Sequence, residues 1–181
     1  VVAPYRTLSI DMGEAMKAPE YLAINPMGKV PAIVRCPTIV TECAAMCAWL
    51  ADVFPDAQLA PPPRERAAYY RWLFFAAGPL EAAIVDRAVG LQAPPDKESM
   101  VGYGRFETAM DGLEAALVVD DFVAGPTFTA ADVYVGSQVG WGLQFGTIED
   151  RPAFRRYWER LADRPALRRA VEIDDAAMDS A

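Results

Sequence analysis

The sequence contains no histidine and has only three cysteines, Cys36, Cys43 and Cys47. Without histidine, the common cysteine–histidine combinations that bind zinc cannot form, and three cysteines give no disulfide framework. The composition therefore predicts a protein without a metal site. The cysteine content best fits the reducing environment of the cytoplasm.

The sequence also lacks long apolar runs and an excess of basic residues. No stretch approaches the roughly 20 apolar residues that a membrane helix needs, and no charged and then apolar signal peptide is visible. The 17 basic and 25 acidic residues give a formal net charge of −8. Because an acidic surface repels backbone phosphates, nucleic acid is not an expected partner. The hydrophobic content of 53% in 181 residues is enough for a core in one domain or two small ones.

Residues 25–33 combine a turn with an extended stretch. Asn25, Pro26 and Gly28 are typical turn residues, and Pro31 forces Val30 out of the helical region. If the peptide bond before Pro31 is cis, the backbone N–H and C=O of Val30 face outward. They could then pair with a peptide-like ligand, as the edge of a sheet does. An ordinary loop proline is the alternative.

A second informative segment begins ten residues later. Residues 38–40 form a short β-type run, and a helical pattern opens at Thr41 and Glu42. The apolar stripe of that helix is predicted to contain Ala45, Met46, Trp49 and Leu50. The N–H groups of its first turn, with the Thr41 hydroxyl and the Glu42 carboxylate, would suit a zwitterionic amino-acid head group beside the proline edge.

Together these two segments resemble those of glutathione transferases of the bacterial cytosolic type. The resemblance covers nearly the whole chain, including YLAINP at 21–26, CAWLAD at 47–52 and FTAADV at 128–133. It implies an α+β fold with two domains. The N-terminal domain would be thioredoxin-like, of the βαβ-ββα type, and an all-α helical bundle would follow.

The composition places the domain boundary before residue 64. Asp56 and the proline run at 61–63 break any helix and mark a linker. We therefore predict a partial thioredoxin-like, glutathione-binding domain over residues 1–53, a linker over 54–63 and an all-helical domain over 64–181. Within the helical domain, long amphipathic stretches are expected over about 64–89 and 96–119, and shorter helices over 150–163 and 165–172, with a frayed tail after 174.

Residues 129–132 have the pattern of a capping box at the start of another helix. The side chain of Thr129 would accept the backbone N–H three residues on, and Asp132 would reach back to the N–H of Thr129. This motif is predicted to be structural rather than catalytic.

The resemblance also implies that part of the N-terminal domain is absent from this sequence. Residues 5–11 match the second strand of the family, so one βα unit of roughly 20–25 residues is missing. We therefore expect the biological protein to be longer. In the family, the missing segment supplies the serine, tyrosine or cysteine that stabilises the glutathione thiolate. The catalytic residue is therefore unknown.

The resemblance implies a glutathione site built from both segments. Val30, before the cis Pro31, would bind the backbone of the cysteinyl part, while Glu42 and Cys43 would hold the γ-glutamyl amine and carboxylate. Relatives usually have serine in place of Cys43, and a thiol is a weaker donor than a hydroxyl, although the backbone N–H of Cys43 is still present.

Many relatives carry a histidine near residues 15 and 16 that approaches the glycyl carboxylate of glutathione. Lys17 or Lys29 could replace it here, and solvated surface charges are the alternative interpretation for both lysines. The electrophile would bind between the domains, where Glu81 and Trp141 occupy positions that line this site in some bacterial relatives. The alternatives are a surface carboxylate for Glu81 and core packing for Trp141.

The implied function is a detoxifying transferase that conjugates the thiol of glutathione to a hydrophobic electrophile. Glutathione would be the co-substrate, no metal would be required, and the protein would form a twofold homodimer through the helix that contains Tyr69 and Tyr70. The alternative is a non-catalytic module of the same fold that binds glutathione or a protein. Disulfide exchange by Cys43 is less favoured, because thiol-active relatives carry their cysteine at the first helix.

Overall fold

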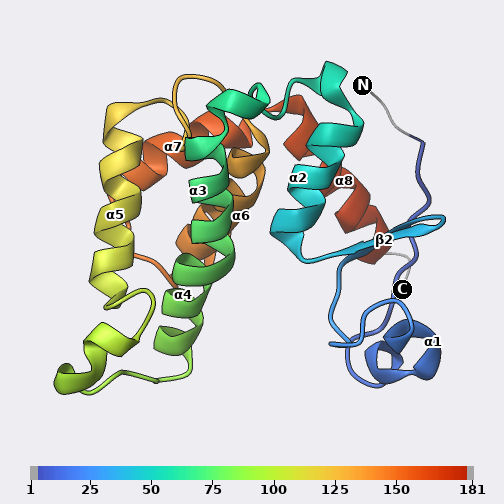
Figure 1. The fold of residues 1–181 in the computed structure, drawn as a ribbon, viewed down its shortest axis with the longest axis horizontal. Coiled ribbons are helices and arrows are strands. Elements are labelled where there is room, and N and C mark those ends of the chain that lie inside the picture. The colour runs from blue at the N-terminus through green and yellow to red at the C-terminus, as the bar shows by residue number, and fades with distance from the viewer. Residues whose placement is uncertain (1–3, 179–181) are drawn as a thin grey trace.

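The computed structural model describes residues 4–178. Figure 1 shows a small part made of a β-hairpin with helices α1 and α2, beside a larger group of helices that includes α3–α7. The elements in chain order are η1 (Ala15–Lys17), α1 (Pro19–Leu22), β1 (Ala32–Arg35), β2 (Thr38–Thr41), α2 (Cys43–Val53), η2 (Pro55–Ala57), η3 (Pro63–Glu65), α3 (Ala67–Phe75), η4 (Ala76–Leu80), α4 (Glu81–Ala88), η5 (Pro95–Met100), α5 (Phe106–Val119), α6 (Ala130–Phe145), α7 (Pro152–Ala162) and α8 (Pro165–Met178).

The small part contains one antiparallel hairpin. Strand β1 pairs with β2 so that Ala32 lies opposite Thr41 and Arg35 opposite Thr38. The predicted strand over residues 5–11 is wrong, because the structure assigns no strand there. A strand needs a hydrogen-bonded neighbour, and within residues 4–178 the two strands of the hairpin pair only with each other.

The main core lies among the helices of the larger part. Its most deeply buried large side chains include Tyr69 of α3, Met110 of α5, Val135 of α6 and Tyr157 of α7. Since Tyr69 is only 1% exposed, it cannot contribute to a subunit contact as the sequence suggested.

Helix α2 joins this core by a different face from the predicted stripe. Met46 is buried as expected, but Ala45 is exposed. The side chains that pack against the helical core are mostly small: Ala44, Cys47, Ala48 and Ala51. Small side chains let two helix backbones approach closely, so packing selected this face rather than the one with the largest apolar residues.

Three of the predicted helices have different limits. The stretch over 64–89 is interrupted by the π-helical turn η4, which contains Pro79. Helix α5 begins only at Phe106, after a loop in which Gly104 adopts a φ of +69°. Helix α8 continues to Met178, so the predicted fraying after 174 is wrong within the described residues.

Within residues 4–178, no helix is long and apolar enough to cross a membrane.

The capping box at the start of α6 is confirmed. The Thr129 hydroxyl accepts the N–H of Ala131 at 3.2 Å, and Asp132 Oδ2 accepts the N–H of Thr129 at 2.8 Å. Asp132 Oδ1 also accepts the N–H of Val123 at 2.8 Å and the hydroxyl of Tyr157 at 2.9 Å. This buried carboxylate therefore joins α6, the loop before it and α7.

Candidate functional site

The turn before Val30 is held by two buried side chains. Asn25 Oδ1 accepts the N–H of Met27 at 3.1 Å, and its Nδ2 donates to the carbonyl of Lys29 at 2.8 Å. The Tyr21 hydroxyl donates to the same carbonyl at 2.7 Å. Because the Lys29 carbonyl is fixed from two directions, the next residue, Val30, is held in place at the end of the hairpin.

Lys17 stabilises the same turn with two hydrogen bonds. Its Nζ donates to the carbonyl of Met27 at 3.0 Å and to that of Gly28 at 3.2 Å. Lys17 is therefore not a simple solvated charge, and two of the three donors of its ammonium group are used by the turn. Lys29, by contrast, is exposed, and its side chain has no hydrogen bond or ion pair within residues 4–178.

The contact between Lys17 and Gly28 can be tested by mutation. Gly28 has a φ of +58°, and an added Cβ would lie 2.7 Å from both Lys17 Nζ and the Met16 carbonyl oxygen. We expect Gly28→Ala to lower the free energy of unfolding by about 2–3 kcal/mol in denaturant titration. Gly90→Ala is the control, because Gly90 has a φ of +76° but nothing within 4 Å of a Cβ. An equal loss in both variants would show that the contact with Lys17 contributes nothing.

The Val30–Pro31 peptide bond is cis, as the motif allowed. Neither the N–H nor the C=O of Val30 has a hydrogen-bond partner in the described chain, and its side chain is exposed. The next pairs of the hairpin place Ala32 opposite Thr41. Continuing this register by one residue sets Pro31 beside Glu42, so the two predicted segments meet at one end of the hairpin.

The start of α2 presents free backbone donors at this meeting point. Met46 is the first residue of α2 whose N–H bonds back along the chain, to the Glu42 carbonyl at 2.9 Å, and no side chain caps the helix. The preceding N–H groups and the positive end of the helix dipole can therefore receive an anion. Glu42 has a φ of 68°, an unusual value for a residue with a side chain, and strain of this kind is concentrated at functional sites.

The cysteines of α2 are poor nucleophiles. Burial raises the pKa of the partly buried Cys43 thiol, and the negative charges of Glu81 and Glu42 raise it further. Burial, with a contribution from Cys43, raises the pKa of Cys47 to about 11. Both side chains are therefore neutral thiols at pH 7, whereas disulfide exchange requires a thiolate.

Glu81 lies at the first turn of α4 and is linked to α6. The Tyr134 hydroxyl donates to Glu81 Oε2 at 2.9 Å, and burial together with this bond raises the pKa of Tyr134. The carbonyl of Ala76, at the start of η4, accepts two hydrogen bonds. One comes from the Glu81 N–H and the other, at 3.1 Å, from Nε2 of Gln138. Since proline has no N–H, the π-helical turn at Pro79 needs such support.

Trp141 lies on α6 two turns after Tyr134 and on the same face. Its side chain is 65% exposed, so core packing is excluded. Sequence analysis missed Tyr134 and Gln138. Tyr134 lies seven residues and Gln138 three residues before Trp141, and this spacing indicates a common face of the helix. Only the structure shows that this face of α6 meets Glu81.

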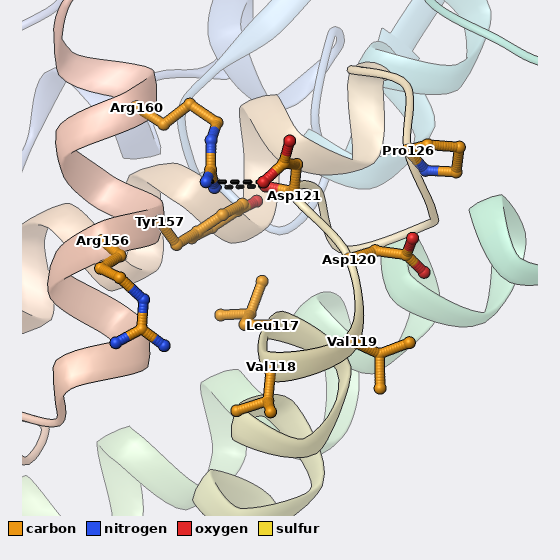
Figure 2. A pocket seen from close by; sticks show the side chains of 9 residues that line it. All are labelled: Leu117, Val118, Val119, Asp120, Asp121, Pro126, Arg156, Tyr157 and Arg160. Atoms are coloured by element: carbon orange, nitrogen blue, oxygen red, sulfur yellow. Dashed lines mark hydrogen bonds and ion pairs between the residues drawn. The ribbon is translucent and has the colours of Figure 1, made fainter.

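A concave region on the helical part lies away from this site. A hollow of about 390 Å³ lies between the end of α5 and α7. Figure 2 shows the side chains that line it. Arg160 pairs there with Asp121 at 2.7 Å, and Arg156 and Asp120 also line it. The two arginines are balanced by two aspartates, so the hollow has no net charge to attract an anion. None of the predicted site residues lines it.

The described residues contain no group of three or more histidine, cysteine, aspartate or glutamate side chains that could hold a metal ion. The site therefore consists of backbone donors and acceptors, carboxylates, a lysine and aromatic rings.

The fold is that of glutathione S-transferases. A sphingomonad glutathione S-transferase, solved in complex with glutathione, matches with a TM-score of 0.70 and 27% identity, over 88% of this chain and 80% of that one. No protein-family profile matches the chain.

Curated relatives agree with this assignment. Glutathione S-transferase GstA of Escherichia coli O157:H7 is 27% identical over 161 residues, which is 86% of this chain and 78% of GstA. Disulfide-bond oxidoreductase YfcG of Escherichia coli K12 is 28% identical over 191 aligned residues, covering 97% of this chain and 88% of YfcG. The predicted resemblance and the fold, with a thioredoxin-like N-terminal part and a helical C-terminal part, are confirmed. The names of most of these relatives support the predicted enzyme class.

Proposed function

We propose that this chain conjugates the thiol of glutathione to an electrophilic small molecule. The observation that carries the proposal is the meeting of the unpaired Val30 backbone with the open first turn of α2 at one end of the hairpin. An extended peptide can pair with the first, and a carboxylate can bind at the second. The structural neighbour crystallised with glutathione supports glutathione as the co-substrate.

Each charged group of glutathione has a counterpart at the site. The Val30 N–H and C=O would pair with the cysteinyl backbone next to Pro31. The γ-glutamyl carboxylate would accept the N–H groups of the first turn of α2, including that of Cys43, and its ammonium group would bind the exposed Glu42 carboxylate. The glycyl carboxylate would bind Lys29, which is exposed and whose side chain has no hydrogen bond or ion pair within residues 4–178. These are charge-assisted contacts, which are stronger than neutral hydrogen bonds.

The chemical requirement is an ionised glutathione thiol. With a pKa of about 8.5, a free thiol is only ~3% thiolate at pH 7, so the enzyme must lower this pKa. Burial and two carboxylates raise the pKa of Cys43, which disfavours its thiol as the nucleophile. The electrophile would bind beside glutathione against Glu81 and Trp141, between a glutathione-binding unit over residues 1–53 and a helical unit over 64–181.

We also propose an oligomeric state and a cellular location for the enzyme. Tyr70 and Phe74 lie exposed on α3, one turn apart, and such a face supports a twofold homodimer. The free cysteines and the acidic charge fit a cytoplasmic detoxifying enzyme.

The test is thioether formation from glutathione and 1-chloro-2,4-dinitrobenzene. We expect Glu42→Ala to lower kcat/KM for glutathione at least about tenfold, because the ammonium group loses a charge-assisted bond. Glu107→Ala, at an exposed glutamate on α5, is the matched control and should leave the rate unchanged. If folded protein binds glutathione but never exceeds the spontaneous rate with any electrophile, the non-catalytic binding module is the better account. The weak donor Cys43 already favours that second candidate.

A further inference from the structure

The Glu81 carboxylate lacks a cationic partner. It forms no ion pair with any lysine or arginine of residues 4–178, and its one hydrogen bond comes from the Tyr134 hydroxyl on Oε2. Its side chain is exposed at the start of α4. The tyrosine ties the carboxylate of α4 to α6, and Oε1 has no hydrogen-bond partner among the described residues.

Aromatic rings continue from this carboxylate along α6. Tyr134, Gln138, Trp141 and Phe145 are spaced four, three and four residues apart, so they share one face of the helix. Trp141 is 65% and Phe145 70% exposed. Trp141 lies about 10 Å along the helix from Tyr134. Such a face suits a ligand with an apolar or aromatic body and a charged head at Glu81.

The polar side chain between Tyr134 and Trp141 on this face of α6, Gln138, carries no charge. Gln138 donates through Nε2 to the Ala76 carbonyl, and its buried Oε1 has no hydrogen-bond partner among the described residues. The surface from Glu81 to Trp141 is therefore negative or neutral. An anionic electrophile would be repelled there, and a cationic one attracted.

This surface adjoins the proposed glutathione site. Helix α2 packs against both η4 and α6, the two elements that position Glu81 and Tyr134. In agreement with this packing, the charge of Glu81 reaches the first turn of α2, where it contributes to raising the pKa of Cys43. A ligand at Glu81 would therefore lie next to glutathione bound at that turn.

We propose that the Glu81–Tyr134 pair makes the enzyme selective for electrophiles that carry a positive charge, with the cation at Glu81 and the apolar body against Trp141. The inference rests on the proposed function, because it names the substrate class of the same site. Glu81 acts here as a specificity-determining residue and takes no part in bond formation.

A matched pair of 4-chloro-3-nitrobenzamides tests the selectivity. One carries an N-(2-trimethylammonioethyl) group and the other the neutral N-(3,3-dimethylbutyl) group of the same shape. In both, the glutathione sulfur attacks the ring carbon that bears chlorine. A C–S bond forms, the C–Cl bond breaks, chloride leaves with the bonding electrons, and the thiol proton goes to solvent. No oxidant or other reactant is required.

The measured quantity is the ratio of kcat/KM for the cationic and neutral compounds, corrected for their spontaneous rates. We expect a ratio of about five for the natural protein, because one attractive charge at a partly exposed site has roughly this effect. Glu81→Gln keeps an oxygen that accepts the Tyr134 hydroxyl but removes the charge, and should bring the ratio to about one. Glu107→Gln, at an exposed glutamate of α5, should leave the ratio unchanged. Added salt should lower the ratio of the natural protein.

Equilibrium binding separates this inference from the proposed function. The same two benzamides without chlorine cannot react, and isothermal titration gives their dissociation constants. A preference for the cation that is lost in Glu81→Gln supports the inference even if no turnover occurs, in which case only the proposed function fails. Turnover with a ratio near one, or a ratio that Glu81→Gln does not change, would overturn the inference and leave the proposed function intact.

Discussion

Asp132→Asn is expected to destabilise the protein by about 3–5 kcal/mol, the largest effect of any conservative substitution considered. Asp132 is 1% exposed, and both of its oxygens accept hydrogen bonds from buried donors. In asparagine, the NH₂ group must replace one oxygen. It would then face either the N–H of Val123 or the N–H of Thr129, and neither backbone donor can turn away.

Chemical denaturation followed by circular dichroism measures this loss. Asp120→Asn is the control, since Asp120 is exposed and its side chain forms no hydrogen bond or ion pair within the described residues. It should change stability by less than about 0.5 kcal/mol. A loss of under about 1 kcal/mol in Asp132→Asn would contradict the view that this carboxylate holds α6 and α7 together.

Arg151→Met should cost about 2 kcal/mol at low ionic strength. Arg151 lies just before α7 with a side chain only 16% exposed, and its guanidinium contacts Asp111 at 2.7 Å, Glu114 at 2.9 Å and Glu149 at 2.6 Å. Removing it both loses these bonds and leaves three carboxylates facing one another across α5 and α7. Thermal unfolding at low and high salt measures the effect, which salt should reduce because it screens the repulsion.

The control for this network is a single exposed ion pair. Arg168 contacts Asp163 at 2.6 Å, and both side chains are mostly exposed. Isolated pairs of this kind contribute about 0.2–1 kcal/mol, so Arg168→Met should have little effect. If the two arginine variants lose equal stability, the three carboxylates around Arg151 do not act as a network.

The features that the sequence predicted correctly are those encoded by neighbouring residues. The turn at Asn25, the strand over residues 38–40 and the capping box at Thr129 each depend on two to four consecutive side chains. Local backbone preferences and capping bonds are sufficient to determine them. The cis bond before Pro31 belongs with them, because it came from a motif of adjacent residues.

The features that the sequence did not predict depend on residues far apart in the chain. The hydrogen bond between Tyr134 and Glu81 joins residues that are 53 positions apart in the sequence. The hydrogen bond from Lys17 to the Gly28 carbonyl joins residues that are 11 positions apart. The predicted strand over 5–11 failed for a related reason, since strand formation depends on a partner and not on propensity alone. Periodicity predicted a helix from about residue 96, but α5 begins at Phe106, after Gly104 with its positive φ.

The candidate site combines features encoded by neighbouring residues with features that depend on long-range contacts. Local motifs set the Val30 edge and the start of α2, and the hairpin register brings them together. The packing of α2 against η4 and α6 then brings the charge of Glu81 near enough to raise the pKa of Cys43. The proposed glutathione site is therefore encoded largely by local sequence, whereas the proposed electrophile site depends on how the helices pack.

Isothermal titration of glutathione into the protein, with Glu42→Ala and Glu107→Ala measured alongside, shows whether the end of the hairpin and the start of α2 bind glutathione. The account predicts a dissociation constant between micromolar and low millimolar for the natural protein and for Glu107→Ala. It predicts affinity at least about tenfold weaker for Glu42→Ala, because the γ-glutamyl ammonium loses its carboxylate partner. Absence of binding by well-folded natural protein, or equal binding by all three proteins, would contradict it.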